Sequence, residues 1–383
     1  MSTQVCVAGG GPAGLMLGLL LARGGVPVVV LEKHADFLRD FRGDTVHPST
    51  IRLLERLGLA EKFLALPHRK VGQLRVIAGA TTYQIADFTT LPRPYNYLAF
   101  LPQWDFLDFL ADEAAAYPHF TLLRSTEVSG LIDDGVVRGV RAEGPDGAVE
   151  VHAPLTVACD GRGSDVRRLL GATPHEFGAP MDVLWFRLPR RESDGDGLLM
   201  RIGSGQLMLT IDRGDYWQVA YVIPKGGYDK VVARGLPAFR EAVAGLWSVL
   251  ADRVGQIAEW DQVRMLTVQV NRLKQWHAPG VLMIGDAAHA MSPVGGVGVN
   301  LAIQDAVATA RLLTGPLRAG RLTESDLARV RQRRWLPTAG TQLVQRIIQR
   351  GLIGAVLQPG RPAAAPLPMR IANRLRPIRA MAA

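Results

Sequence analysis

The residues best suited to bind a ligand lie between positions 285 and 300, where the sequence reads GDAAHAMSPVGGVGVN. A strand-like run ends just before Asp286, a glycine-rich loop follows Pro293, and a helical pattern begins near Asn300. A carboxylate at the end of a strand can accept a hydrogen bond from a sugar hydroxyl. Backbone N–H groups at a helix N-terminus favour an anionic ligand. Because a reduced flavin carries an anion on its ring, this pattern indicates a flavin site.

A second ligand-binding pattern lies near the N-terminus, where residues 9–14 read GGGPAG. A short β-branched strand precedes them and an apolar helix follows. The pattern fits G-x-G-x-x-G, in which Gly9 permits a tight turn, Gly11 lets the backbone approach a pyrophosphate, and Gly14 lets helix and strand pack closely. In this setting the motif predicts a dinucleotide site rather than an ordinary glycine-rich turn.

An acidic residue completes this N-terminal unit. A second strand, residues 27–31, ends at Glu32, which lies 18 residues after Gly14 (32 − 14 = 18). An acid at this distance is expected to bind a ribose. NAD fits the unit as well as FAD does, so other motifs must decide between them.

Two further motifs favour FAD over NAD. Residues 159–167 read CDGRGSDVR and fit D-G-x-x-S-x-x-R, and Gly285-Asp286 with Pro293 fits G-D-x(6)-P. The three motifs, in this order, resemble those of the group A flavoprotein monooxygenases, the aromatic hydroxylase family of p-hydroxybenzoate hydroxylase and the ubiquinone-biosynthesis hydroxylases. The resemblance implies bound FAD. It also implies NADH or NADPH as a transient co-substrate, since the sequence has no second dinucleotide fingerprint.

The resemblance implies an α/β fold, with a Rossmann-type FAD-binding domain, an inserted, mainly antiparallel β-sheet substrate domain and C-terminal helices. We expect the discontinuous FAD-binding domain at residues 1–70, 97–177 and 263–320. The substrate-binding sheet is expected at 71–96 and 178–262, and a basic helical tail at 321–383. The length of 383 residues and the 48% hydrophobic content suit such a fold.

The resemblance also carries cofactor contacts over to this sequence. Arg42 follows the second strand, where a guanidinium can pair with phosphate or lie over a conjugated ring. Gln103 stands where relatives place arginine or glutamine at the start of a helix. The complete set of expected FAD contacts is Gly9, Gly11, Pro12, Ala13, Gly14, Glu32, Lys33, Arg42, Gln103, Asp160, Gly161, Gly285, Asp286, Pro293, Gly296, Gly298, Val299 and Asn300.

The candidates for a catalytic role are Arg42, His47 and Pro293. His47 precedes a proline and is expected in extended backbone, as a proton carrier or as a structural histidine. His289 is expected to be structural. No Ser-His-Asp set, paired acid or nucleophilic cysteine is present, and the family needs none. Its cofactor makes the new bond through a C4a-hydroperoxyflavin formed from NAD(P)H and O2.

Five residues on the inserted strands are candidates to line a substrate pocket: Trp185, Arg187, Met208, Val219 and Tyr221. Period-2 geometry places Val219 and Tyr221 on one face of their strand. Packing in the core is the alternative for each. A pocket of this composition suits an aromatic or polyketide-like molecule, with Arg187 as a possible anion anchor.

Three other functions share the FAD motifs. Halogenases carry W-x-W-x-I-P, whereas residues 219–224 read VAYVIP and lack both tryptophans. An FAD-dependent reductase or dehydrogenase without oxygen insertion remains open. So does a flavin-holding protein that binds or cyclises a ligand without redox turnover.

Cysteine content and the N-terminus predict the compartment. Cys6 and Cys159 are expected to be buried, reduced thiols, and no cysteine or histidine cluster has the spacing of a metal site. The N-terminus lacks the features of a signal peptide, and no run of about 18 apolar residues is present. We therefore expect a cytoplasmic protein, and the sequence leaves its oligomeric state open.

The formal net charge of +9 belongs to the tail. Residues 321–383 contain twelve arginines and two acids (12 − 2 = +10), whereas the rest has 44 − 12 = 32 basic and 35 − 2 = 33 acidic groups. The alternation of basic and apolar residues fits a helix pair packed on the body, a peripheral membrane contact or an acidic partner. No series of stacking aromatics is interleaved with the arginines, so no nucleic-acid partner is expected.

Overall fold

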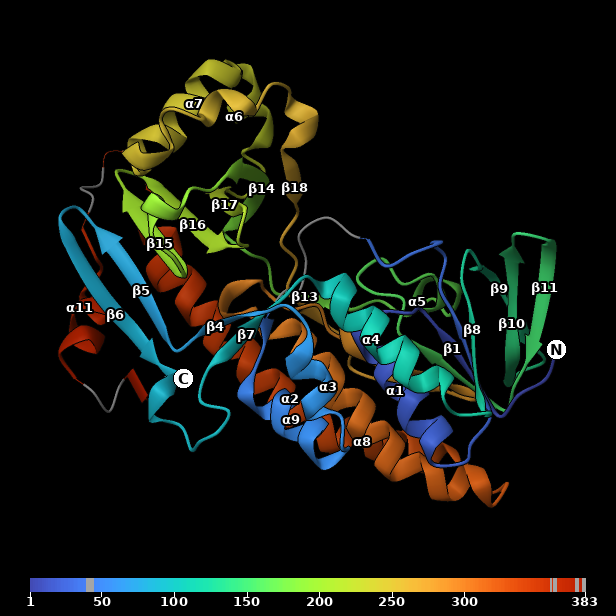
Figure 1. Ribbon diagram of the computed structural model, residues 1–383. Helices are drawn as coiled ribbons and strands as arrows, with labels where there is room; N and C mark the ends of the chain where they lie inside the picture. Colours follow the sequence, from blue (N-terminus) through green and yellow to red (C-terminus); the bar gives the residue numbers. More distant parts are fainter. Residues whose placement is uncertain (39–44, 359, 361–363, 376–378, 381–383) are drawn as a thin grey trace. The chain divides into compact units, whose positions relative to one another are not determined.

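The computed structural model describes residues 1–38, 45–358, 360, 364–375 and 379–380. The chain forms two compact units. Unit 1 contains residues 1–43, 102–178 and 269–343, and unit 2 contains residues 44–101, 179–268 and 344–383. Figure 1 shows the helices and strands of both.

A six-stranded sheet forms the centre of unit 1, in the order β20-β21-β12-β1-β2-β8. Its strands are β1 (Val5–Ala8), β2 (Val28–Leu31), β8 (Phe120–Leu123), β12 (Leu155–Ala158), β20 (His277–Ala278) and β21 (Val281–Met283). All neighbours pair in parallel except the edge strand β20. Every residue of β1, β2 and β12 is buried, as continuous β-branched and aliphatic runs require when both faces of a parallel sheet are covered.

Two layers cover the sheet of unit 1. On one side, α1 (Pro12–Arg23) packs between α4 (Gln103–Ala115) and α8 (Gly298–Arg318). On the other side, Cys6, Val29 and Leu31 pack against an antiparallel sheet of β9 (Glu127–Asp133), β10 (Val137–Gly144) and β11 (Gly147–His152). Shorter elements of unit 1 are α5 (Asp165–Leu169), β13 (His175–Glu176) and β19 (Asn271–Arg272).

A seven-stranded sheet forms the centre of unit 2, in the order β18-β14-β17-β16-β15-β5-β6. Its strands are β5 (Gln73–Ala78), β6 (Thr81–Asp87), β14 (Met181–Pro189), β15 (Leu198–Gly203), β16 (Gln206–Asp212), β17 (Tyr216–Pro224) and β18 (Arg264–Leu266). Only the β15–β5 pair is parallel. Residues of α7 (Gly235–Leu246), preceded by α6 (Tyr228–Ala233), pack on one face of this sheet.

Smaller elements complete unit 2. They are β3 (Thr45–Val46), β4 (Arg69–Val71), β7 (Leu98–Phe100), α2 (Pro48–Arg56), α3 (Ala60–Ala65), α10 (Gly354–Val356) and α11 (Leu367–Arg374). Strand β7 pairs with both β3 and β4. Helix α9 (Glu324–Ile348) begins in unit 1, and its residues from Val344 onward belong to unit 2.

The mixed α/β fold with a parallel sheet, a mainly antiparallel sheet and C-terminal helices is the fold class that the sequence predicted. The unit boundaries differ from the expected domain boundaries, since residues 44–70 and 97–101 lie in unit 2. Strands β3 and β4 pair with β7, and Leu98 and Phe100 of β7 pack in one cluster with Ile211 of the seven-stranded sheet. Helix α7 ends at Leu246, and a short 3-10 turn, Ser248–Leu250, follows.

Both cysteines are buried and free, as predicted. Burial raises the pKa of the Cys6 thiol to about 12, so it stays protonated at neutral pH. In the described part of the chain, no helix is long and apolar enough to cross a membrane. The same residues contain no cluster of acidic, histidine or cysteine side chains that could hold a metal ion.

Candidate functional site

The turn between β1 and α1 needs its glycines. Gly9 has φ +105°, and a Cβ there would lie 2.5 Å from the carbonyl oxygen of Cys159. A Cβ on Gly14 would lie 1.9 Å from the carbonyl oxygen of Gly9, so helix and turn touch at that point. At Gly11 the nearest atom to such a Cβ is 3.9 Å away. The backbone at Gly11 is therefore open to a close ligand, as a pyrophosphate needs.

Glu32 follows β2 and is 7% exposed. Its Oε2 accepts the backbone N–H of Gly10 at 3.0 Å, and its Oε1 accepts that of His34 at 3.0 Å. The carboxylate thus connects the glycine turn with the end of the second strand, where a ribose-binding acid is expected. Lys33 beside it is exposed and pairs with Glu127 at 3.3 Å.

The 159–167 motif folds into a turn that leads into α5. Asp160 Oδ2 accepts the N–H of Val166 at 3.1 Å, and Ser164 caps the helix by accepting the N–H of Arg167 at 3.0 Å. Arg167 donates to the carbonyl of Ala287 at 2.9 Å, which ties this turn to the 285–300 loop. Burial raises the pKa of Asp160, whose Oδ1 is buried without a hydrogen-bond partner among the described residues.

A second connection joins the same two segments. Arg162 Nε donates to Asp286 Oδ2 at 2.9 Å, and Arg162 Nη2 lies 3.5 Å from the carbonyl oxygen of Met291. Within the described residues, Arg162 Nη1 is buried and has no hydrogen-bond partner. Asp286 keeps 29% of its side chain exposed. This pairing places a cation and an anion at the predicted site.

The loop from Gly285 ends at the N-terminus of α8. Gly295 and Gly296 have φ of +80° and +60°, so the chain turns through two left-handed residues before the helix. The N-cap residue of α8, Val297, has no side chain that can cap the helix. Asn300, 3% exposed, donates to the carbonyl of Gly296 at 3.2 Å and holds the loop. The uncapped helix end favours an anionic ligand group.

These features fit FAD. The buried polar atoms Asp160 Oδ1 and Arg162 Nη1 need partners, which a nucleotide with ribose and phosphate oxygens can supply. Gly11 and Gly161 leave open space where a side chain would otherwise stand. The residues that would hold the cofactor are Glu32, Asp286 and the backbone at the start of α1 and α8.

Sequence reasoning missed Asp305 and Arg334. Asp305 lies on α8 with no exposure, and its Oδ2 accepts from His289 Nε2 at 2.6 Å and from the N–H of Gly285 at 3.1 Å. Arg334, on α9, donates through Nε to Asp305 Oδ1 at 2.6 Å. Burial alone would raise the pKa of Asp305, but His289 and Arg334 outweigh burial and lower it. The signal in the sequence was a lone acid between two apolar helical stretches, residues 301–303 and 306–308.

The remaining predicted cofactor and catalytic residues belong to several elements. Arg42 lies outside the described residues. Gln103 is the first residue of α4, at the helix start as predicted. His47 has extended backbone (φ −80°, ψ 158°) before α2, and its ring lies 6.4 Å from that of Phe88 in an edge-on arrangement, both in unit 2. Pro293 precedes the 3-10 turn Val294–Gly296.

The five substrate candidates divide between the two faces of the unit 2 sheet. Met208, Val219 and Tyr221 are buried in a cluster with α7 residues, so Val219 and Tyr221 do share a face, but that face is filled by the helix. Trp185 and Arg187 lie on the opposite face. There Trp185 packs beside Ile211, and the Arg187 guanidinium lies over the Tyr216 ring, 4.8 Å from its centroid.

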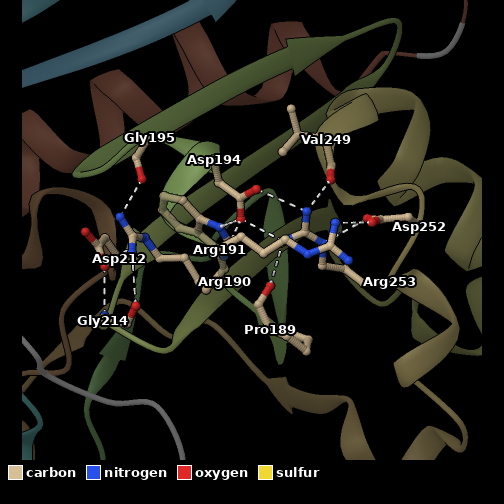
Figure 2. A network of polar contacts seen from close by, with 11 residues as sticks. Pro189, Arg190, Arg191, Asp194, Gly195, Asp212, Gly214, Val249, Asp252 and Arg253 are labelled. Carbon is tan, nitrogen blue, oxygen red and sulfur yellow. Dashed lines mark hydrogen bonds and ion pairs between the residues drawn. The ribbon is translucent and has the colours of Figure 1, made fainter.

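A separate polar network lies at one end of the same sheet (Figure 2). Arg253 donates to both oxygens of Asp194, at 2.7 and 3.0 Å, and Trp217 Nε1 donates to Asp194 at 3.0 Å. The remaining Arg253 donors reach Asp252 and the carbonyls of Pro189 and Val249. Because these groups satisfy one another's hydrogen bonds, we assign the network a structural role.

Comparison with known proteins gives relatives along almost the whole chain. The family described as FAD binding domain matches residues 2–335. The 6-methylpretetramide 4-monooxygenase of Streptomyces rimosus is 35% identical over 96% of this chain and 89% of its own length. The 12-dehydrotetracycline 5-monooxygenase/anhydrotetracycline 6-monooxygenase of the same species is 30% identical over 80% of this chain and 61% of its own length.

Among solved structures, PqsL of Pseudomonas aeruginosa, in complex with 2-aminobenzoylacetate, is similar with a TM-score of 0.79. The likeness covers 94% of this chain and 97% of that chain at 23% identity, and so it shows the fold alone.

Proposed function

The chain belongs to the FAD binding domain family, the group A flavoprotein monooxygenases, and on that premise we propose that it hydroxylates a polycyclic, polyketide-like aromatic molecule held by the sheet of unit 2. It is an FAD-dependent monooxygenase that uses NAD(P)H and O2. The observation that carries the substrate class is the 35% identity, over 96% of the chain, to an enzyme named for its action on 6-methylpretetramide. The second relative is likewise named for tetracycline-type substrates.

Unit 1 binds FAD in this proposal. Glu32 accepts a ribose hydroxyl, the open backbone at Gly11 approaches the pyrophosphate, and Asp286 accepts from the ribityl chain. The N-terminus of α8 faces the ring and stabilises its negative charge. The remaining cofactor contacts expected from the sequence belong to the same proposal. Bound FAD supplies the reduction and activation of O2.

Unit 2 binds the substrate in this proposal. Its sheet has an apolar face free of α7, on which Trp185, Leu198 and Leu209 are partly buried against a cluster that includes Ile211 and Phe100. A flat aromatic molecule can stack on such a face and bury its apolar surface. Arg187 and its neighbour Tyr216 add a cation at the edge, which suits an enolate or phenolate oxygen. The chain's task here is to orient the ring and exclude water.

The function is tested with purified protein, NADH or NADPH and a series of tetracyclic phenols and simpler phenols under 18O2. Substrate-stimulated NAD(P)H oxidation, with one labelled oxygen atom in the product, is the expected result. Reduced flavin that persists in air would identify a dehydrogenase. Binding of substrate without any flavin reduction would identify a non-redox binding protein.

The basic tail suggests a further contact, with an anionic membrane surface. On α9 one face exposes Leu336, Leu343, Val344 and Ile347, at 72%, 54%, 56% and 62%. Arg333 and Arg350 are exposed near the two ends of this face. An apolar stripe between cations suits an anionic lipid surface better than a second copy of the same basic helix.

We place the enzyme in the cytoplasm, where NAD(P)H is supplied.

A further inference from the structure

The carboxylate of Asp305 is the meeting point of three segments of unit 1. It belongs to α8, and it binds the 285–300 loop through Gly285 and His289 and α9 through Arg334. Asp305 and His289 are at most 1% exposed, and Arg334 is 7% exposed. Arg334 Nη2 also donates to Gln304 on α8 at 3.0 Å, which fixes the plane of the guanidinium. Both oxygens of the Asp305 carboxylate therefore accept hydrogen bonds, Oδ2 from Gly285 and His289 and Oδ1 from Arg334.

The hydrogen bond to Gly285 bears directly on the cofactor site. Gly285 comes immediately before Asp286 and has φ +58°. A Cβ there would lie 3.3 Å from the Cβ of Ala13, on α1, and 3.5 Å from that of Ala302, on α8. The chain passes here between two helices, and the bond to Asp305 holds the peptide from which the Asp286 side chain projects.

His289 strengthens the same arrangement. Its ring packs against Trp276, with centroids 4.9 Å apart, and Asp305 is the hydrogen-bond partner of its Nε2. Its Nδ1 is buried and has no hydrogen-bond partner among the described residues. The orientation of the imidazole, and with it the backbone of the Ala-Ala-His segment, is therefore set by Asp305.

We propose that Asp305, held by Arg334 and His289, is a positioning residue for FAD: it fixes the Gly285 peptide and so the place of the Asp286 carboxylate at the ribityl chain. This inference rests on the proposed binding of FAD by unit 1. It assigns a cofactor-related role to α9, whose arginine reaches the loop only through Asp305. None of the three residues is required to touch the cofactor.

A purely structural role is the competing explanation, because any buried carboxylate that loses its charge destabilises the fold. A matched residue separates the two. Asp182 in unit 2 is 3% exposed and likewise accepts from a glycine N–H, Gly226 at 2.9 Å, and from a cation, Lys225 at 2.8 Å. Asp182→Asn imposes the same chemical change without touching the 285–300 loop.

The experiment compares Asp305→Asn and Asp182→Asn with the wild type. FAD affinity of the apoprotein is measured by titration calorimetry, the flavin midpoint potential by dye equilibration, and thermal stability without cofactor by calorimetry. Both variants should lose stability. Asp305→Asn should also weaken FAD binding about tenfold or more, the loss expected for a hydrogen-bond arrangement to a charged group. It should shift the flavin potential as well, while Asp182→Asn leaves both unchanged.

Arg334→Lys provides a milder variant that keeps the buried charge if Asp305→Asn does not fold. It loses the bond to Gln304 and the fixed guanidinium plane, and it should weaken FAD binding to a smaller degree. Either variant overturns the proposal if it folds and keeps the wild-type FAD affinity and potential. A wild-type protein that binds no FAD would instead refute the proposed function itself.

Discussion

Arg162 Nε lies 2.9 Å from Oδ2 of Asp286, and this pair joins two motifs that stand 124 residues apart in the sequence. In the proposed site, Asp286 would share its oxygens between this guanidinium and a ribityl hydroxyl, which would weaken FAD binding. The guanidinium also holds the Asp286 side chain in one orientation, which would favour FAD binding.

Asp286→Asn should weaken FAD binding about tenfold to a hundredfold, because a hydrogen bond that involves a charged group contributes roughly 1.5–3 kcal/mol. Arg162→Gln should have a smaller effect, as its amide can still donate to Asp286. Quenching of flavin fluorescence on titration of the apoprotein measures both. Equal FAD affinity in Asp286→Asn and the wild type would show that the Asp286 carboxylate does not bind FAD.

Gly14→Ala should abolish FAD binding and lower the melting temperature, because its Cβ would stand 1.9 Å from the carbonyl oxygen of Gly9. Gly245→Ala, at an exposed position of α7 in unit 2, is the matched control. A Cβ at Gly245 meets nothing within 4 Å, so this variant should keep both properties. The melting temperature and the flavin content of the purified protein report the difference. A Gly14→Ala protein that purifies with full flavin would contradict the close approach of turn and helix.

Asp194 stabilises unit 2 in a pH-dependent way. Burial alone would raise its pKa, but bonds from Arg253, Arg191 and Trp217 outweigh burial and lower the pKa from 3.8 to about 2. A lowered pKa in the folded state means that the stabilisation is complete above pH 3.8 and is lost as pH falls toward about 2. Asp194→Ala removes one of the two carboxylates that bind the buried Arg253 and leaves Asp252 as the other. Because hydrogen bonds to a charged group are lost, it should cost roughly 1.5–3 kcal/mol at neutral pH.

Urea unfolding of wild type and Asp194→Ala across this pH range measures the effect. The difference in unfolding free energy should shrink as the pH falls. A difference that stays constant down to pH 2 would show that the ion pair does not carry the stabilisation.

Trp185→Ala should raise KM for a polycyclic substrate about tenfold, as expected when an aromatic ring loses roughly 1.5 kcal/mol of stacking and burial. It should also increase NAD(P)H oxidation that yields hydrogen peroxide instead of product, because a weakly bound substrate accepts the oxygen atom less efficiently. Tyr221→Phe, on the face covered by α7, serves as the control and should leave KM unchanged. A raised KM in Tyr221→Phe with an unchanged KM in Trp185→Ala would place the substrate on the α7 face.

The exposed face of α9 should bind vesicles that contain phosphatidylserine and leave phosphatidylcholine vesicles free. Sedimentation measures the bound fraction, which should fall as salt screens the arginines. Leu343→Gln combined with Ile347→Gln should abolish binding, whereas Met265→Gln, another exposed apolar position, should not. Equal binding to the two kinds of vesicle, or binding to neither, would refute the membrane contact.

The sequence was sufficient for the parts of the fold that depend on local pattern. The glycine turn, the β2 strand with Glu32 at its end and the loop into α8 follow from spacing and from the needs of a dinucleotide. Their agreement with the structure reflects close backbone packing, as at Gly14, which few sequences permit.

Relations between distant segments could not be obtained in this way. Alternation showed that Val219 and Tyr221 share a face, but it could not show that α7 would fill that face. The partners of the Asp305 carboxylate come from two segments, the 285–300 loop and α9, and no spacing rule connects position 305 with Arg334. Residues 44–70 belong to unit 2, and the packing of β7 residues Leu98 and Phe100 with Ile211 could not be read from a local pattern.

The order of strands in unit 1 has a consequence for how the enzyme is made. Val5 pairs with Leu155 (155 − 5 = 150 residues apart), and β12 then pairs with β21, so the sheet cannot close while most of the chain is still on the ribosome. Asp305 gains its arginine only when α9 has emerged. If Asp305 positions FAD as proposed, the cofactor site is complete only at the end of synthesis. A chain truncated before α9 would contain every flavin motif, but Asp305, which binds the 285–300 loop, would lack its partner Arg334.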